Sequence, residues 1–275
     1  MTVVLAVAAG VLIGLSLGAL GGGGSILAVP ALVYLLGQSP AQATTGSLVV
    51  VGVTALAGAI AAQRAGNVLL GQGIVFGVVA IGGAAAGAWA SSAVSEDVLL
   101  AAFAVLMLLV GGLMAWRQLH HEDTDDEQDA RPRPRLDDPI ITFSPTFHCA
   151  CPRALKVLVT ATVVGLLTGF LGVGGGFLVV PALVLALGMP MTYAVGTSLV
   201  VIAITAGAAL TVRAGSGASP DWGLVLLLTV VSSLAALLGA RLADRTDTDR
   251  LQGAFTLLVL GVAVYTAIRA IPALF

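Results

Sequence analysis

The sequence predicts an all-helical integral membrane protein built from two homologous halves. Two observations predict this fold class. Of the 275 residues, 58% are hydrophobic and only 9% are charged, whereas about a quarter of a soluble domain is charged. In addition, one segment occurs twice along the chain. A single water-soluble core cannot bury this much apolar sequence, so we set a soluble fold aside.

Long uncharged stretches give the number of expected membrane crossings. Six of them carry no Asp, Glu, Lys or Arg: residues 1–63, 65–95, 98–116, 157–212, 222–240 and 251–268. A membrane helix needs about 20 apolar residues. The two longest stretches have room for two crossings and the others for one, which gives eight. The N-terminus has no basic segment before its apolar run, so we expect a retained helix rather than a signal peptide.

The internal repeat is the strongest organisational signal. Residues 18–50 read GALGGGGSILAVPALVYLLGQSPAQATTGSLVV, and residues 169–201 read GFLGVGGGFLVVPALVLALGMPMTYAVGTSLVV. They align without a gap at an offset of 151, and 18 of 33 positions are identical. Pro30, for example, matches Pro181. Chance does not reproduce glycines and prolines in this order, so the chain consists of two copies of one unit.

Both halves follow the same predicted plan of four long helices and one short segment. The long helices are expected at 3–20, 41–62, 68–93 and 98–116, and again at 154–171, 192–212, 222–242 and 251–270. The short segments, 25–36 and 176–187, follow the first helix and have 12 residues each. As a helix each reaches about 18 Å, against a hydrocarbon layer of about 30 Å. We therefore expect broken or re-entrant elements that are buried in protein or line a cavity.

A polar linker, residues 118–153, separates the halves at 1–117 and 154–275. Its acidic and proline-rich composition indicates a solvated segment. Six of the twelve basic residues lie in or beside it, and basic residues mark the cytoplasmic side. With eight crossings, nine of the twelve basic residues lie on the same side of the membrane as the linker, and with ten crossings, ten do. Both counts predict a cytoplasmic linker. The ten-crossing arrangement gives the larger difference between the two sides, and it makes the halves an inverted repeat.

Each short segment begins at a glycine cluster, which we predict to be an anion-binding break. The cluster residues are Gly21, Gly22, Gly23, Gly24 and the adjoining Ser25 in the first half, and Gly172, Gly174, Gly175 and Gly176 in the second. Glycine lets the backbone turn sharply and exposes its N–H groups. The N-terminus of the following helix adds partial positive charge. The upstream glycines, Gly10, Gly14 and Gly18 with Gly165 and Gly169, are instead expected to serve close helix packing.

Hydroxyl side chains after the short segments are further candidate anion ligands. They are Thr45 and Ser47 in the first half and Thr197 and Ser198 in the second. Their hydroxyls can donate to an oxyanion, or they can simply bond a carbonyl in the preceding turn of their own helix. Arg64 and Arg213 are possible charges at the two mouths of a pathway, or interfacial anchors.

The sequence also argues against enzymatic classes. It contains no GxxxxGK[ST] phosphate loop. A GxSxG pattern at residues 14–18 lies inside an apolar helix, and no histidine lies in any predicted span. His148, Cys149 and Cys151 in the linker are more simply a chance cluster than a metal site. No cofactor, metal or nucleic-acid partner is expected. The expected partners are the lipid bilayer and a small anion, and a homo-oligomer stays open.

With these motifs in place, the chain resembles the sulfite exporter TauE/SafE family. The resemblance covers both halves. It rests on the duplicated pattern of a glycine cluster, Pro-Ala-Leu (residues 181–183) and Ala-x-Gly-Thr-Ser-Leu (residues 194–199). The first copy departs from the last motif, because residues 43–48 read Ala-Thr-Thr-Gly-Ser-Leu, with Gly and Thr permuted. The resemblance implies transport of sulfite, thiosulfate, organosulfonates or related anions, often as export.

The sequence therefore predicts a membrane transporter that works by alternating access around a midplane site, with no enzymatic activity. An anion channel is the first alternative. The second is a membrane sensor that does not transport and works through the linker.

Overall fold

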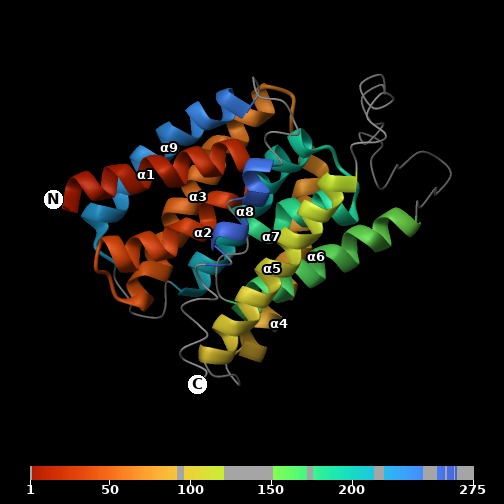
Figure 1. The fold of residues 1–275 in the computed structure, drawn as a ribbon, viewed down its shortest axis with the longest axis horizontal. Helices are drawn as coiled ribbons and strands as arrows, with labels where there is room; N and C mark the ends of the chain where they lie inside the picture. Colours follow the sequence, from red (N-terminus) through yellow and green to blue (C-terminus); the bar gives the residue numbers. More distant parts are fainter. Residues whose placement is uncertain are drawn as a thin grey trace.

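The computed structural model describes residues 2–91, 96–120, 151–171, 176–213 and 220–243, together with the helical residues 253–257, 259–262 and 264. This part of the chain is built from helices and the turns that connect them, as predicted (Figure 1). Most of the linker and the glycines at 172–175 lie outside the described residues.

The first half contains α1 (Thr2–Leu20), the short α2 (Gly23–Pro30), the π-helical turn η1 (Ala31–Leu35), α3 (Pro40–Arg64), α4 (Leu70–Ser91) and α5 (Glu96–His120). The second half repeats this order with α6 (Cys151–Leu171), α7 (Gly176–Pro181), η3 (Ala182–Ala186), α8 (Met191–Arg213) and α9 (Trp222–Ala243). The described residues after 252 fall in the last predicted helix. The other seven predicted long helices are confirmed to within four residues at each end, while the ends of the last one lie outside the described residues.

The short segments contain a feature that the sequence did not predict. Each begins as an α-helix, reaches a proline and continues as one π-helical turn. The N–H of Leu36 donates to the carbonyl of Ala31, five residues earlier, at 3.2 Å. Proline has no N–H and its ring crowds the preceding turn, so the regular hydrogen-bond ladder cannot continue through it. The repeated Pro-Ala-Leu motif therefore widens the same turn in both halves.

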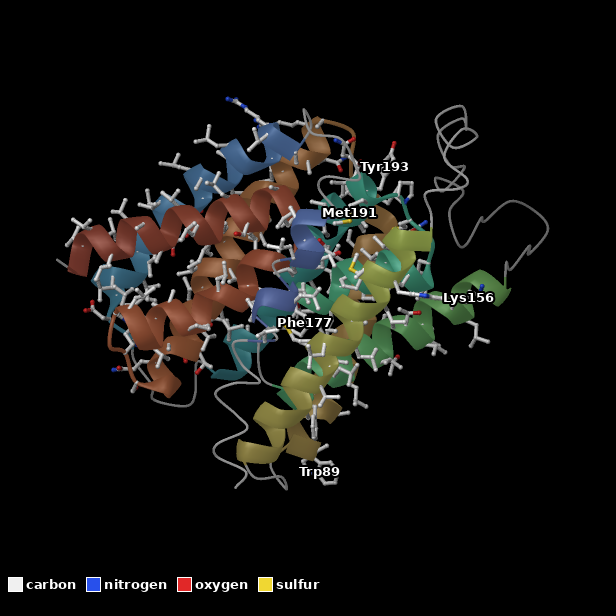
Figure 2. All side chains as sticks on the ribbon, viewed as in Figure 1. Trp89, Lys156, Phe177, Met191 and Tyr193 are labelled. Carbon is white, nitrogen blue, oxygen red and sulfur yellow. The ribbon has the colours of Figure 1, made fainter. Side chains whose placement is uncertain are left out.

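The outer surface is apolar, as expected of a membrane-embedded protein. Five helices are long and apolar enough to cross a membrane, namely α1, α3, α4, α8 and α9, and five shorter apolar segments accompany them in the described part of the chain. Along α9, large side chains such as Leu226, Val230 and Leu234 are exposed. Figure 2 shows the contrast between Trp89, which projects from the end of α4, and Phe177, which is buried near the centre.

The two halves are interlocked rather than placed side by side. The most extensive contacts join α1 to α9 and α4 to α6, so the first long helix of each half packs on the third long helix of the other half. The equivalent helices α3 and α8 also pack on each other. Figure 1 shows α1 and α9 running together along one side of the molecule. Each first helix is therefore covered mainly by the other copy of the repeat.

Glycines allow these helices to approach backbone to backbone. A Cβ added at Gly18 would lie 2.7 Å from the Cα of Ala236 on α9, and one at Gly169 would lie 2.7 Å from the Cα of Ala84 on α4. Gly14 and Gly165 face the partner backbones in the same way. The predicted role of the upstream glycines in close packing is confirmed at these positions.

The direction of the central helices follows from their contacts. Gly52 on α3 lies against Ala206 on α8, while Gly58, further along α3, lies against Leu199, which is earlier on α8. The two helices are therefore antiparallel.

Candidate functional site

The break after α1 is a tight turn centred on Gly21. This residue has φ of 71°, a left-handed conformation that glycine adopts without steric cost. Its N–H closes the end of α1 by donating to the carbonyl of Leu17 at 2.9 Å. The chain then reverses, and α2 folds back on α1, so that Gly24 lies against Leu17. All four glycines of the first cluster are buried.

The two breaks meet at the contact between the halves. A Cβ added at Gly22 would collide with the carbonyl of Gly176 and would lie 2.8 Å from the Cα of Phe177. A Cβ added at Gly176 would lie 2.6 Å from the hydroxyl of Ser25. Ser25 and Gly176 occupy equivalent positions in the repeat, so equivalent positions of the two halves touch here. The glycines thus let the starts of α2 and α7 touch.

Ser198 joins the same centre from α8. The Cβ position of Gly21 lies 2.5 Å from the Ser198 hydroxyl and 3.2 Å from the Cα of Val195. The structure therefore brings together the first glycine cluster, Ser25, Gly176 and Ser198. In the sequence repeat, Gly172 is equivalent to Gly21 and Ser47 to Ser198. Gly172, Gly174 and Gly175 lie outside the described residues, so their predicted role stays a prediction.

The serine hydroxyls donate to their own helices in this conformation. Ser25 bonds the carbonyl of Gly22 at 2.7 Å, Ser47 that of Thr44 at 2.9 Å, and Ser198 that of Val195 at 2.7 Å. This is the intrahelical alternative raised for such residues. Each hydroxyl keeps acceptor capacity but must rotate before it can donate to an oxyanion. Thr45 is buried on the same turn of α3 as Ser47.

Thr197 has a structural role that the sequence did not predict. Its hydroxyl accepts the N–H of Leu69, at the start of α4, at 3.1 Å. The neighbouring Gly196 lies against the carbonyl of Asn67. The Gly-Thr pair of the motif therefore fastens the α3–α4 loop to α8. This contact does not prevent Thr197 from donating its own proton to a ligand.

A small cavity adjoins this end of the site. It has a volume of about 30 Å³ and lies where the ends of α1, α3 and α9 meet the start of α8. Asn67 and Thr192 supply its polar lining, beside Val195 and Gly196. The cavity is small and only partly enclosed.

The two candidate mouth arginines lie at opposite ends of the bundle. Arg64 ends α3 and is exposed, while Arg213 ends α8. Because α3 and α8 are antiparallel, the helix ends that carry the two arginines face opposite ways. In the linker, Cys151 begins α6, whereas His148 and Cys149 lie outside the described residues.

Gln38 is a buried polar residue that the sequence motifs do not single out. It is 8% exposed, and neither amide atom has a hydrogen-bond partner among the described residues. Asn67 and Thr192 beside the cavity were also missed. A signal for Gln38 was present, since the repeat aligns this amide with the apolar Met189.

Comparison with known proteins agrees with this architecture. The sequence pattern of a family described as "Sulfite exporter TauE/SafE" matches residues 6–266. A protein of Xylella fastidiosa (strain 9a5c) named "Probable membrane transporter protein" is 33% identical over 98% of this chain and 96% of its own length. A second, from strain Temecula1, bears the same name and is 32% identical over the same shares. No solved structure matches the chain.

Proposed function

The chain belongs to the sulfite exporter TauE/SafE family of membrane transporters, and from this premise we propose that it exports small sulfur-containing anions of the sulfite, thiosulfate or organosulfonate class. One observation carries the proposal beyond the family name. The two glycine breaks meet backbone to backbone at the interface of the halves, where Ser25 and Ser198 also lie. This is the midplane position at which repeat-built transporters bind their substrates.

The chemistry of this centre suits an anion. The first N–H groups of a helix have no intrahelical acceptor, and the helix dipole adds positive potential there. The start of α2 lies buried in the glycine cluster, so backbone donors and hydroxyls can replace part of the hydration shell of an oxyanion. No Lys or Arg occurs between residues 1 and 63. An anion bound by such groups is held without a permanent opposite charge, which favours release.

Alternating access fits the interlocked halves better than an open channel. The small cavity near Thr192 lies at one side of the centre and is lined by helix ends from both halves. In the proposed cycle, α2 with η1 and α7 with η3 shift against the long helices and open the site first to one side and then to the other. The π-helical turns lack regular ladder bonds and are the natural places to bend.

The antiparallel course of α3 and α8 supports an inverted repeat with ten crossings. The cavity is lined by the ends of α3 and α9 and by the start of α8. Arg64 and Arg241 therefore lie at the same end of the bundle. The glycine contacts show that α6 runs parallel to α4, and α4 parallel to α8, so α6 begins at that same end. The excess of basic residues on this side supports a cytoplasmic location for residues 118–153 of a cell-membrane protein.

Reconstitution into liposomes tests the proposed function. We expect saturable uptake of labelled sulfite, thiosulfate or methanesulfonate by the wild type. Gly22→Ala places a methyl group against the Gly176 carbonyl and should reduce this uptake at least about tenfold. Gly82→Ala is the matched control, because nothing lies within 4 Å of its added Cβ. Folded wild-type protein that moves none of the three anions would refute the proposed substrate class.

A further inference from the structure

Gln38 occupies a position where the fold has no use for an amide. It lies in the turn between η1 and α3, and its own N–H donates to the carbonyl of Leu32 at 3.0 Å. The side-chain oxygen lies 3.6 Å from the Cβ position of Gly46 on α3, which also faces Leu32 and Val225. Leu32 and Val225 are buried. The amide oxygen therefore lies in an apolar part of the α3 surface, and neither amide atom has a hydrogen-bond partner among the described residues.

A buried amide without partners is costly. Such a group loses its hydrogen bonds to water and gains none in exchange. Buried polar groups in native proteins are therefore almost always bonded, and an exception requires an explanation. For Gln38 the explanation is either a structural bond within the chain or a ligand.

The first structural explanation would be that Gln38 caps the start of α3, but other residues already form this cap. The hydroxyl of Ser39 accepts the N–H of Gln42 at 3.4 Å, and the Gln42 side chain accepts the N–H of Ser39 at 3.4 Å. This reciprocal capping box completes the start of α3, and Pro40 at the first position lacks an N–H in any case. Gln38 lies outside the box.

The second structural explanation, a requirement of the turn itself, is excluded by the other half of the protein. There Met189 stands in place of Gln38, and its N–H donates to the carbonyl of Leu183 at 3.1 Å. The preceding glycines, Gly37 and Gly188, both have φ of 65°. The same helix-ending turn therefore forms with an apolar, buried side chain, so the fold does not require an amide.

We propose that Gln38 is a substrate-contacting residue whose amide donates hydrogen bonds to the transported anion in the half-site of the first repeat. Gly46, next to the amide, separates the predicted ligands Thr45 and Ser47. An amide nitrogen offers two donors to an oxyanion. With Met189 in the equivalent position, the second half-site lacks this donor, so the two sides of the pathway bind the anion unequally. This inference rests on the proposed function.

Exchange of the two turn residues tests the proposal. Gln38→Met should leave the melting temperature of the detergent-solubilised protein unchanged or raise it. The anion concentration that half-saturates uptake and thermal stabilisation should rise about tenfold, with sulfite, thiosulfate or methanesulfonate as the anion. A loss of affinity of this size is typical when a hydrogen bond to a charged ligand is removed. Gln38→Glu, which repels an anion, should weaken both further. Met189→Gln is the matched control and should change half-saturation by less than about twofold.

Three results would overturn the proposal. A lower melting temperature in Gln38→Met with unchanged half-saturation would show that the amide is structural. A second is stronger thermal stabilisation of Gln38→Glu than of the wild type by sodium, whichever anion is present. This would show that the amide oxygen binds a cation. If the wild type transports none of the three anions, the proposed function fails, but anion binding can still be measured by thermal stabilisation. In that case the Gln38 proposal is overturned if sulfite, thiosulfate, methanesulfonate, sulfate and chloride stabilise wild type and Gln38→Met equally.

Discussion

In the first half of the molecule the turn before the third helix holds Gln38, whereas in the second half the same turn holds Met189. The starts of the fourth helices differ as well. The N–H of Leu69 at the start of α4 is bonded by Thr197 from the other half, while α9 is capped by its own Asp221, whose carboxylate accepts the N–H groups of Gly223 and Leu224.

Identical residues occur in both halves at a helix crossing and at the turns that end helices. Gly18 corresponds to Gly169 at the crossings with α9 and α4, Gly37 to Gly188 in left-handed turns, and Pro30 to Pro181 before the π-helical turns. The backbone contact of Gly22 with Gly176 is not repeated in this way, because the residue equivalent to Gly22 is Val173. The comparison separates these shared positions from the caps and buried polar groups, at which the halves differ. The following changes test this division, from the largest expected effect to the smallest.

Valine at the two equivalent helix crossings should be equally damaging. Gly18→Val and Gly169→Val each drive a branched side chain into the partner backbone, at Ala236 and Ala84 respectively. We expect each to destabilise by about 4 kcal/mol or more, measured as loss of folded, monodisperse protein and of melting temperature. If one variant is tolerated and the other is not, the halves are not interlocked symmetrically.

Removal of the cross-half cap should have an intermediate effect. Thr197→Val preserves shape but leaves the buried N–H of Leu69 without its acceptor, at a cost of about 1–3 kcal/mol. Thermal unfolding measures the loss. Thr211→Val is the control, because the exposed Thr211 hydroxyl bonds only the carbonyl of Ala208 in its own helix. Equal melting temperatures for the two variants would contradict the capping role.

The cap within the second half should matter less, since Asp221 is exposed. Asp221→Ala removes the acceptor for two N–H groups of α9 and should cost about 1 kcal/mol. Asp221→Asn keeps a competent cap and should retain most of that stability. The expected order of melting temperatures is wild type, Asn, Ala. A lower value for Asn than for Ala would show that the carboxylate acts in some other way.

The smallest effect is expected from a neighbouring pair of glycines on α4. Gly82→Ala meets no atom within 4 Å and should stabilise by about 0.5–1 kcal/mol through helix propensity. Gly83→Ala meets the carbonyl of Thr162 on α6 and should destabilise. Opposite shifts in melting temperature for adjacent residues would confirm that contact with α6, rather than glycine flexibility, sets the requirement. Shifts of the same sign would contradict it.

The sequence predicted the helices well because their lengths depend on local apolar runs. Predicted ends such as 222–242 differ from α9 by a single residue. Packing glycines were recognisable because a spacing of four places them on one helix face. The π-helical turns were not predicted, since proline indicates only that the ladder breaks and not how it resumes. The sequence showed Gln38 opposite Met189, but burial without a partner is a three-dimensional property.

Among the candidate site residues, Thr197 and Ser198 also have a use within the fold. Their hydroxyls make them candidate ligands, with a bond to their own helix as the alternative. Ser198 makes such a bond, and Thr197 accepts the N–H of Leu69 from the other half. A linear motif cannot distinguish a hydroxyl that binds substrate from one that caps a helix, because both need the same chemistry at the same position. The role of these residues as ligands stays a prediction.

The interlocking of α1 with α9 also has a consequence for biosynthesis. α1 leaves the ribosome first, but the helix that covers its glycine face is made after most of the chain. Until then the nascent first half must rest in the bilayer with a small-residue groove facing lipid or an insertion chaperone. Long-range closure of this kind is slow. A chain terminated after α5 should therefore be a substrate for membrane quality control rather than a stable half-transporter.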